Sequence, residues 1–210
     1  MNSEPSVFVV GDDPAMRHSL EWLIESAGLR VRSYASAEEF LASYYPGQAG
    51  CLLVDVRMPG MSGLELQAYL SRENIRIPLI IITGHGDVTM AVKAMRAGAL
   101  DFIEKPFNDE DLITSLRMAL DTDQKRRYDR AQRAEIARRL AELTPREHEV
   151  MEMVTEGRSN REIASALGVS TKTVEAHRAR VMDKMRATSL AELVRLCLIA
   201  GISATEGPVT

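Results

Sequence analysis

Short apolar runs alternate with amphipathic stretches over the first 120 residues of the chain. The apolar runs occupy residues 7–10, 30–34, 51–54, 79–83 and 101–104, and polar residues, glycine or proline end each one. Between them, apolar residues recur with a helical period at about 15–27, 37–44, 63–73, 88–97 and 109–120. Five strands alternating with five helices predict an α/β doubly wound fold, in which helices cover both faces of a five-stranded parallel sheet.

The pattern changes after residue 120. Residues 121–139 are charged, lack Gly and Pro and are rich in helix formers, so we expect a helical linker there. Four short helical segments follow without a strand, and three of them begin with a capping-box pattern: Thr144 with Glu147, Ser159 with Glu162, and Ser189 with Glu192. We therefore predict a domain at 1–120, a helical linker at 121–142 and an all-helical domain at 143–210.

Composition and charge narrow the classes of protein that fit. The chain of 210 residues is 45% hydrophobic, which is enough to bury a core in each domain. Residues 1–120 hold 10 basic and 16 acidic side chains, whereas residues 121–210 hold 16 basic and 14 acidic ones. Nucleic-acid binding is therefore disfavoured in the first domain and permitted in the second.

Cysteine use and hydropathy point to a cytoplasmic protein. Cys51 and Cys197 both lie in apolar runs, so we expect two buried thiols rather than a disulfide. No apolar run approaches the ~18 residues that a membrane span needs. We accordingly expect a soluble protein with no membrane partner.

Polar residues with a shared chemistry follow the predicted strands of the first domain. Asp12 and Asp13 follow the first strand, Asp55 ends the third, Thr83 ends the fourth and Lys105 follows the fifth. In a parallel sheet these positions meet at one edge. Carboxylates bind Mg²⁺, and a carboxylate can also accept a phosphoryl group. A lysine and a hydroxyl can then stabilise the phosphoryl oxygens.

The second domain carries a helix-turn-helix pattern. Ala164 is a small residue where two helices can touch, Gly168 can form the turn, and Val174 can face back from the second helix. We expect residues 171–186 to form the recognition helix, with Val174, Val181 and Met185 on its buried side.

The opposite side of that helix is polar or small, and it would enter a major groove. Residues 170–186 hold five basic and two acidic side chains. A helical bundle with a solvated polar face is the plainer alternative. The residues expected on this side are Lys172, Glu175, Ala176, Ala179, Arg180 and Asp183.

The first domain resembles the receiver domains of response regulators, which have a flavodoxin-like fold. The resemblance rests on four segments in the same order and spacing, VFVVGDD, LLVDVRMPGMSG, IIITGHGD and DFIEKPF. It implies that Asp55 is phosphorylated, that Lys105 binds the phosphoryl group, and that Thr83 and Phe102 form the switch. It also implies a cis bond between Lys105 and Pro106, and Mg²⁺ held by Asp12, Asp55 and the backbone carbonyl of Arg57, with Asp13 as a further candidate.

The second domain resembles the LuxR/NarL group of DNA-binding domains, and the whole chain resembles FixJ-type regulators. The matching segment is LTPREHEVMEMVTEGRSNREIASALGVSTKTVEAHRARVMDKM. The resemblance adds Thr173, His177 and Arg178 to the candidate DNA contacts, the last two flanking the reading face. It implies a transcription regulator rather than an enzyme, with a sensor histidine kinase, double-stranded DNA and RNA polymerase as partners and a homodimer when phosphorylated.

Gly11 is the departure from the receiver pattern. Receivers usually carry two acidic residues directly after the first strand, and here Gly11 takes the place of the first. We expect this change to weaken Mg²⁺ binding without removing the direct ligands. It leaves open a regulator that binds DNA independently of phosphorylation. An aspartyl-phosphate phosphatase is a weaker alternative, because Arg57 stands where such enzymes carry a second Asp.

Overall fold

A computed structural model describes residues 4–84 and 88–202. Contacts within the chain divide it into two compact units, unit 1 (Met1–Arg127) and unit 2 (Tyr128–Thr210). Residues 85–87, which belong to the expected GHGD segment, lie outside the described residues. None of the helices described is long and apolar enough to cross a membrane.

Unit 1 is built on a five-stranded sheet in which every paired strand is parallel to its neighbour. The strand order is β2-β1-β3-β4-β5, so the direction of winding reverses between β1 and β3. The strands are β1 Ser6–Val10, β2 Val31–Tyr34, β3 Gly50–Asp55, β4 Leu79–Thr83 and β5 Asp101–Glu104. The predicted doubly wound sheet is confirmed.

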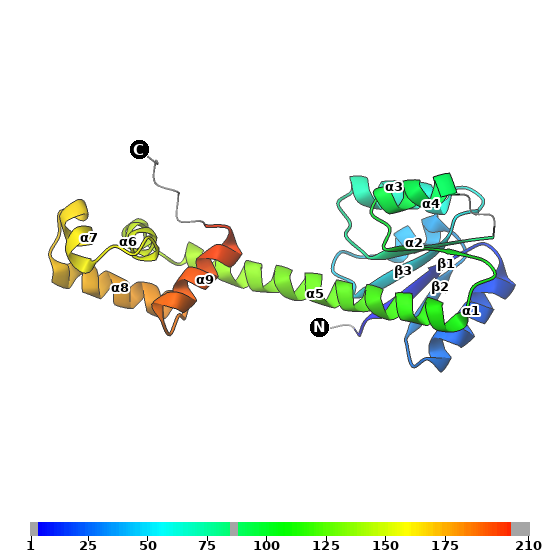
Figure 1. Ribbon diagram of the computed structural model, residues 1–210, viewed down its shortest axis with the longest axis horizontal. Helices are drawn as coiled ribbons and strands as arrows, with labels where there is room; N and C mark the ends of the chain where they lie inside the picture. The colour runs from blue at the N-terminus through cyan, green and yellow to red at the C-terminus, as the bar shows by residue number, and fades with distance from the viewer. Residues whose placement is uncertain (1–3, 85–87, 203–210) are drawn as a thin grey trace. The chain divides into compact units, whose positions relative to one another are not determined.

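Helices cover both faces of this sheet (Figure 1). On one face α1 (Pro14–Ser26) and the first part of α5 (Asp109–Ala141) pack against side chains such as Val9 and Ile80. On the other face α2 (Ala37–Ser43), α3 (Gly63–Arg72) and α4 (Val88–Arg96) pack against Phe8 and Ile81. Because the central strands are buried on both faces, they appear in the sequence as continuous apolar runs rather than alternating ones.

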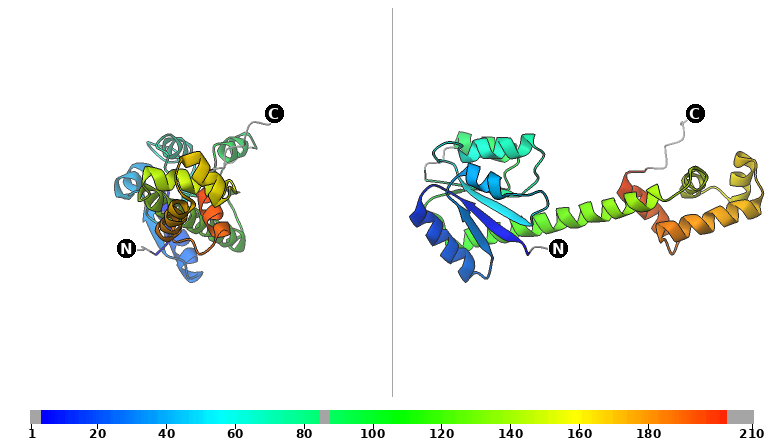
Figure 2. Two further views of the ribbon diagram at one scale, coloured as in Figure 1. Left: turned by 90° about the vertical axis from the view of Figure 1, so that its left-hand side faces the viewer. Right: turned by 180° about the vertical axis from the view of Figure 1, so that it is seen from behind.

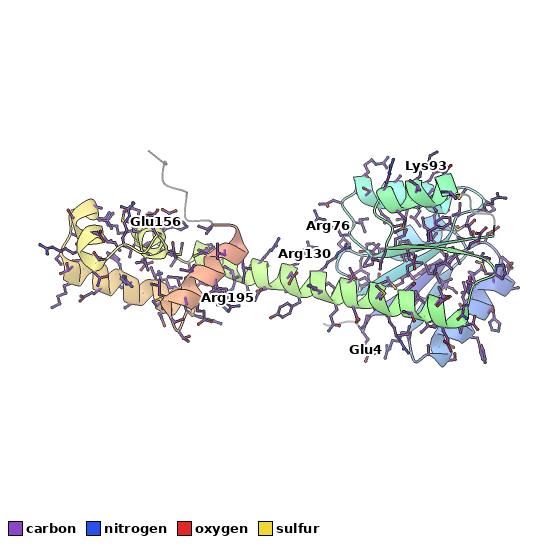
Figure 3. All side chains as sticks on the ribbon, viewed as in Figure 1. Glu4, Arg76, Lys93, Arg130, Glu156 and Arg195 are labelled. Carbon is purple, nitrogen blue, oxygen red and sulfur yellow. The ribbon has the colours of Figure 1, made fainter. Side chains whose placement is uncertain are left out.

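The helix expected at 109–120 and the expected linker form one helix, α5, which is 33 residues long. Residues 109–141 contain neither Gly nor Pro, so nothing in the backbone interrupts the helical hydrogen bonds. Exposed side chains such as Arg130 project from its middle part (Figure 3).

Unit 2 is helical, as predicted. Its core includes Ile136 from the end of α5, together with side chains from each of the following helices. The end of α5 therefore packs with the helices that follow it. The helices after α5 are α6 Pro145–Thr155, α7 Asn160–Leu167, α8 Thr171–Met185 and α9 Leu190–Ala200.

Two of the three predicted capping boxes form completely, those at Thr144 and Ser159. At α9, the Ser189 hydroxyl accepts the Glu192 amide, but the Glu192 carboxylate turns to Thr188 instead of the Ser189 amide. The prediction of a complete box there is wrong, because the Thr188 hydroxyl and amide offer the carboxylate two donors one residue earlier.

Both cysteines are buried thiols, as predicted, and each lies in a different unit. Burial, with a smaller contribution from the charge of Asp123, raises the pKa of the Cys51 thiol to about 12. Cys197 lies in the unit 2 core beside Met151. Neither thiol has the low pKa or the exposure that redox chemistry requires.

Candidate functional site

The candidate phosphorylation site lies at the carboxyl ends of β1 and β3. These strands are neighbours, with Val10 opposite Val54, so the residues that follow them are brought together. Asp12 is exposed in the loop after β1, whereas Asp55 at the end of β3 is only 8% exposed. The winding of the sheet reverses at this point, which is where ligands bind in open α/β sheets.

Lys105 forms an ion pair with Asp55, with 2.6 Å between Nζ and Oδ2. The other carboxylate oxygen, Oδ1, accepts a hydrogen bond of 3.0 Å from the backbone N–H of Arg57. The Asp55 carboxylate is thus held in one orientation, beside the cation of Lys105. The two residues are 50 positions apart in the sequence. This arrangement suits a carboxylate that receives an anionic group, because the ammonium can follow the new charge.

Two residues that the sequence analysis did not single out hold the loop after Asp55. Gly63 begins α3 so close to β3 that an added Cβ would lie 2.4 Å from the Asp55 carbonyl oxygen. Its amide donates to the Val56 carbonyl at 3.1 Å. From α2, the Glu38 carboxylate accepts the Met61 amide at 3.1 Å. The pKa of Glu38 is lowered by its own backbone amide, the Ser36 hydroxyl and this Met61 hydrogen bond.

The remaining receiver candidates lie on β4 and β5. Thr83 is fully buried at the end of β4, and its carbonyl accepts the Lys105 amide at 2.8 Å, which fixes where the lysine leaves the sheet. Phe102 is half-buried and packs against the core on the α2–α4 side. The Lys105–Pro106 peptide bond is cis, as predicted.

The donor atoms at this edge suit Mg²⁺. Asp12 and Asp55 would supply two carboxylates and Arg57 a backbone carbonyl, and Mg²⁺ commonly uses one or two carboxylates and keeps several waters. Within residues 4–84 and 88–202 no group of three or more His, Cys, Asp or Glu side chains is arranged to hold a metal ion. Asp13 has a structural role, because its Oδ1 caps α1 by accepting the Ala15 and Met16 amides at 2.9 and 3.4 Å.

The first turn of α1 also faces this site, which the sequence analysis missed. The sulfur of Met16 lies 2.6 Å from Nζ of Lys105. The Arg17 guanidinium donates to the Gly11 carbonyl at 2.6 Å. The helical period of α1 could have indicated that both positions face the sheet, but not which atoms they meet.

The candidate DNA interface is the pair α7 and α8, which meet at a sharp turn (Figure 2, yellow and orange helices). Gly168 ends α7 in the left-handed conformation at φ 65°, and Ala164 and Val174 are buried where the helices touch. Val181 and Met185 are also buried, so the predicted inner stripe of α8 is confirmed.

The outer side of α8 divides the predicted contacts into two groups. Lys172, Glu175, Ala176, Ala179 and Arg180 are exposed. Thr173, His177 and Arg178 are half-buried, and the Thr173 hydroxyl contacts that of Ser170 at the helix cap. The Arg178 guanidinium donates to Asn160 Oδ1 on α7 at 2.8 Å, so it braces the two helices. Nδ1 of His177 is buried, and within the described part of the chain it has no hydrogen-bond partner.

Comparison with known proteins identifies both parts of the chain. Residues 7–117 match the family model described as the response regulator receiver domain, and residues 141–197 match that of bacterial regulatory proteins of the luxR family. The chain is 46% identical over 200 residues to the transcriptional regulatory protein FixJ of Azorhizobium caulinodans, covering 95% of each chain. It is 48% identical to nodulation protein W of Bradyrhizobium diazoefficiens, covering 95% of this chain and 88% of the relative.

Solved structures give the same result. The response regulator StyR superposes with a TM-score of 0.86 at 41% identity, covering 93% of this chain and 99% of StyR. The crystal structure of FixJ-N matches with a TM-score of 0.53 at 47% identity, covering 57% of this chain and 95% of that one. The chain therefore belongs to the FixJ-like two-component response regulators, transcription regulators that join a receiver domain to a LuxR-type DNA-binding domain.

Proposed function

We propose that Asp55 is the phosphoryl acceptor through which a sensor histidine kinase controls DNA binding by this regulator. The observation that carries the proposal is the Lys105–Asp55 ion pair at 2.6 Å, at the edge where the sheet reverses its winding. A carboxylate oxygen of Asp55 forms a bond to phosphorus while the bond from phosphorus to the donor's leaving group breaks, and that group departs with the electron pair. The product is an aspartyl phosphate, and Lys105 follows the charge onto the phosphoryl oxygens.

The metal proposed here is Mg²⁺, held by Asp12, Asp55 and the backbone carbonyl of Arg57. When bound, it would neutralise charge on the phosphoryl oxygens during transfer. Asp13 is a weaker candidate ligand, since its Oδ1 already caps α1. The chain's own contribution is to orient Asp55 through the Arg57 amide and to supply the Lys105 cation.

Thr83 and Phe102 are the proposed switch. Thr83 ends the strand beside β3, and Phe102 lies one strand further on, half-buried against the core. A phosphoryl group on Asp55 offers an acceptor to the Thr83 hydroxyl, and the space that Thr83 leaves on turning can be filled by Phe102. We propose that this change favours a homodimer, which matches paired half-sites on DNA.

The proposed domains are a receiver at 1–120, a helical linker at 121–142 and a DNA-binding domain at 143–210. The exposed residues Lys172, Glu175, Ala176, Ala179 and Arg180 form the proposed reading face. Thr173, His177 and Arg178 act beside it, through the helix cap and through packing. RNA polymerase is the proposed downstream partner, and the chain acts as a regulator rather than an enzyme.

The test is to incubate the full-length protein with acetyl phosphate and Mg²⁺ and to measure phosphorylation by intact-protein mass spectrometry. We expect one added phosphoryl group on the wild type and none on Asp55→Asn. Asp101→Asn is the matched control, because Asp101 lies on β5 and bonds to Ser115 rather than to the pocket. Labelling that persists in Asp55→Asn contradicts the assignment.

A regulator that ignores phosphorylation is the second candidate, and Gly11 is the observation that favours it. DNA binding measured before and after acetyl phosphate treatment separates the two. If phosphorylation occurs and changes neither DNA affinity nor sedimentation, the receiver does not control the DNA-binding domain.

A further inference from the structure

The space beside Gly11 is occupied by Met16. Gly11 is buried and is not among the glycines with a positive φ, so its backbone could carry any side chain. A Cβ added there would lie 2.5 Å from Cε of Met16 and 3.8 Å from Cβ of Asp55. A side chain at position 11 would therefore extend toward the pocket. The methyl group of Met16 occupies the space in which such a side chain would start.

Met16 also contacts the cation of the pocket. Its sulfur lies 2.6 Å from Nζ of Lys105, which itself lies 2.6 Å from Oδ2 of Asp55. A thioether is a weak acceptor on a flexible, polarizable side chain. Met16 thus lies between Gly11 and the lysine that pairs with the proposed phosphoryl acceptor.

Beside Asp12, the other acidic residue of this loop is Asp13. Asp13 Oδ1 caps α1, and the Arg17 guanidinium donates to the Gly11 carbonyl at 2.6 Å. Near position 11 the carboxylates of Asp12, Asp13 and Asp55 are therefore opposed by the cations of Lys105 and Arg17. The two cations reduce the attraction that these carboxylates exert on an arriving Mg²⁺.

We propose that Met16 is a positioning residue of the phosphorylation pocket that, paired with Gly11, holds down its affinity for a divalent cation. This inference rests on the proposed function of Asp55 and concerns how the same site is tuned. In Gly11→Asp, the new carboxylate must displace the Met16 methyl group toward Lys105, so part of the gain in attraction is lost. Shortening Met16 removes that obstacle, and the two substitutions should therefore reinforce each other.

The test is a double-mutant cycle of Mg²⁺ affinity, measured by calorimetric titration of the full-length protein with MgCl₂ and no phosphodonor. The variants are Gly11→Asp, Met16→Ala and the double variant. We expect Gly11→Asp to tighten binding, and Met16→Ala alone to tighten it less, because residue 11 then adds no carboxylate. Each variant changes the Mg²⁺ affinity by some factor relative to the wild type. The factor for the double variant should exceed the product of the two single-variant factors by about threefold or more, the size of coupling expected for residues in contact. An additive cycle overturns the inference.

Three further proteins make the outcome unambiguous. Met118→Ala is the matched control, because Met118 is an exposed methionine on α5, and it should bind Mg²⁺ as the wild type does. Met16→Leu replaces Met16→Ala in the cycle if circular dichroism shows that the alanine variant is unfolded. A leucine side chain is shorter than that of methionine and has no sulfur. If Asp55→Asn binds Mg²⁺ as tightly as the wild type, the proposed function fails; if it loses binding and the cycle is additive, only the role of Met16 fails.

A second measurement observes Met16 directly. In protein labelled with ¹³C at the methionine methyl groups, the Met16 resonance, assigned from Met16→Leu, should shift when Mg²⁺ is added to the wild type. The Met118 resonance should remain in place. A Met16 resonance that does not respond to saturating Mg²⁺ contradicts the proposed contact between this side chain and the metal pocket.

Discussion

The carboxylate of Asp123 on α5 accepts a hydrogen bond from the backbone N–H of Gly50, with 3.0 Å between Oδ2 and N, across 73 residues of chain. Asp123 is only 7% exposed, and the Arg127 side chain one turn later donates to the Gly47 carbonyl. Burial raises the pKa of Asp123, against the opposing effects of the Gly50 amide and the nearby arginines. Two residues of the expected linker thus belong physically to unit 1.

Replacing Asp123 should destabilise unit 1. Asp123→Ala leaves the buried Gly50 amide without its acceptor, so we expect a loss of about 1–3 kcal/mol in the free energy of unfolding. Asp123→Asn keeps an acceptor oxygen and should cost less. Urea unfolding followed by circular dichroism gives the free energies, and hydrogen exchange at residues 50–55 localises the effect to the start of β3.

Asp121→Ala is the control, since Asp121 is an exposed residue on the same helix, and it should change stability little. Equal losses in Asp121→Ala and Asp123→Ala would mean that the effect comes from helix propensity in α5 and not from the Gly50 hydrogen bond.

Most of the fold could be predicted because the physical signals are local. Strands buried on both faces, such as β4, appear as unbroken apolar runs, and Leu79–Thr83 was predicted with its observed bounds. Capping residues such as Ser159 mark the helix starts. The extent of α5 was harder, because a charged helix without Gly or Pro carries no local signal for where one unit ends. Ile136, which enters the core of unit 2, is the one large aliphatic residue between residues 121 and 139.

The part of the candidate site that could be predicted from the sequence consists of the polar residues that directly follow the ends of strands. Asp55 and Lys105 could be brought together from the topology, because parallel strands end at the same edge. Gly63 and Met16 could not, because their roles depend on distances between atoms that are remote in sequence: a Cβ at Gly63 would meet the Asp55 carbonyl, and the Met16 sulfur meets Lys105.

Acid should destabilise unit 2 through Glu147. This carboxylate is 2% exposed and accepts hydrogen bonds from Lys184 Nζ at 2.6 Å and the Thr144 amide at 2.9 Å. The pKa of Glu147 is lowered to about 2, from an ordinary value of 4.5. The hydrogen bond from Lys184 contributes most to this shift, followed by the one from the Thr144 amide. Because the folded pKa is the lower one, the stabilisation is complete above about pH 4.5 and is lost as the pH falls toward 2.

Glu147→Gln should remove this part of the acid dependence and reduce stability near pH 7 by about 1–3 kcal/mol, less than for a fully buried pair because Lys184 is partly exposed. Methyl NMR of Met151 and Met185, both in the core of unit 2, follows its unfolding in the whole protein. Glu149→Gln, on the exposed side of α6, is the control. An acid profile in Glu147→Gln that matches the wild type would place the acid sensitivity elsewhere.

Gly63→Ala should disturb Asp55. The added methyl group would lie 2.4 Å from the Asp55 carbonyl oxygen, which belongs to the backbone of a central strand and cannot swing away as a side chain could. We expect a loss of about 1–3 kcal/mol in stability, as for other overpacked sites, together with slower phosphorylation by acetyl phosphate. Gly84→Ala, where an added Cβ would meet nothing within 4 Å, should keep wild-type stability. Wild-type stability and phosphorylation in Gly63→Ala would contradict the close packing of α3 on β3.

Arg180 and Arg178 should respond differently to truncation, although they lie two residues apart on α8. Arg180 is exposed on the proposed reading face, whereas Arg178 is half-buried and bonded to Asn160. If Arg180 contacts phosphate, Arg180→Ala should weaken binding to a mixed-sequence duplex and reduce the slope of log affinity against log salt by about 1. Fluorescence anisotropy at several salt concentrations measures both quantities.

Arg178→Ala should instead lower the stability of unit 2, by about 1–3 kcal/mol, because it leaves the Asn160 side chain without its charged donor. Its salt slope should stay near that of the wild type once the folded fraction is accounted for. A reduced salt slope in Arg178→Ala with unchanged stability would mean that Arg178 contacts DNA. A wild-type salt slope in Arg180→Ala would mean that Arg180 does not contact DNA. Either outcome would contradict these assignments. Since the two residues share side-chain type and helix, the comparison isolates the direction in which each faces.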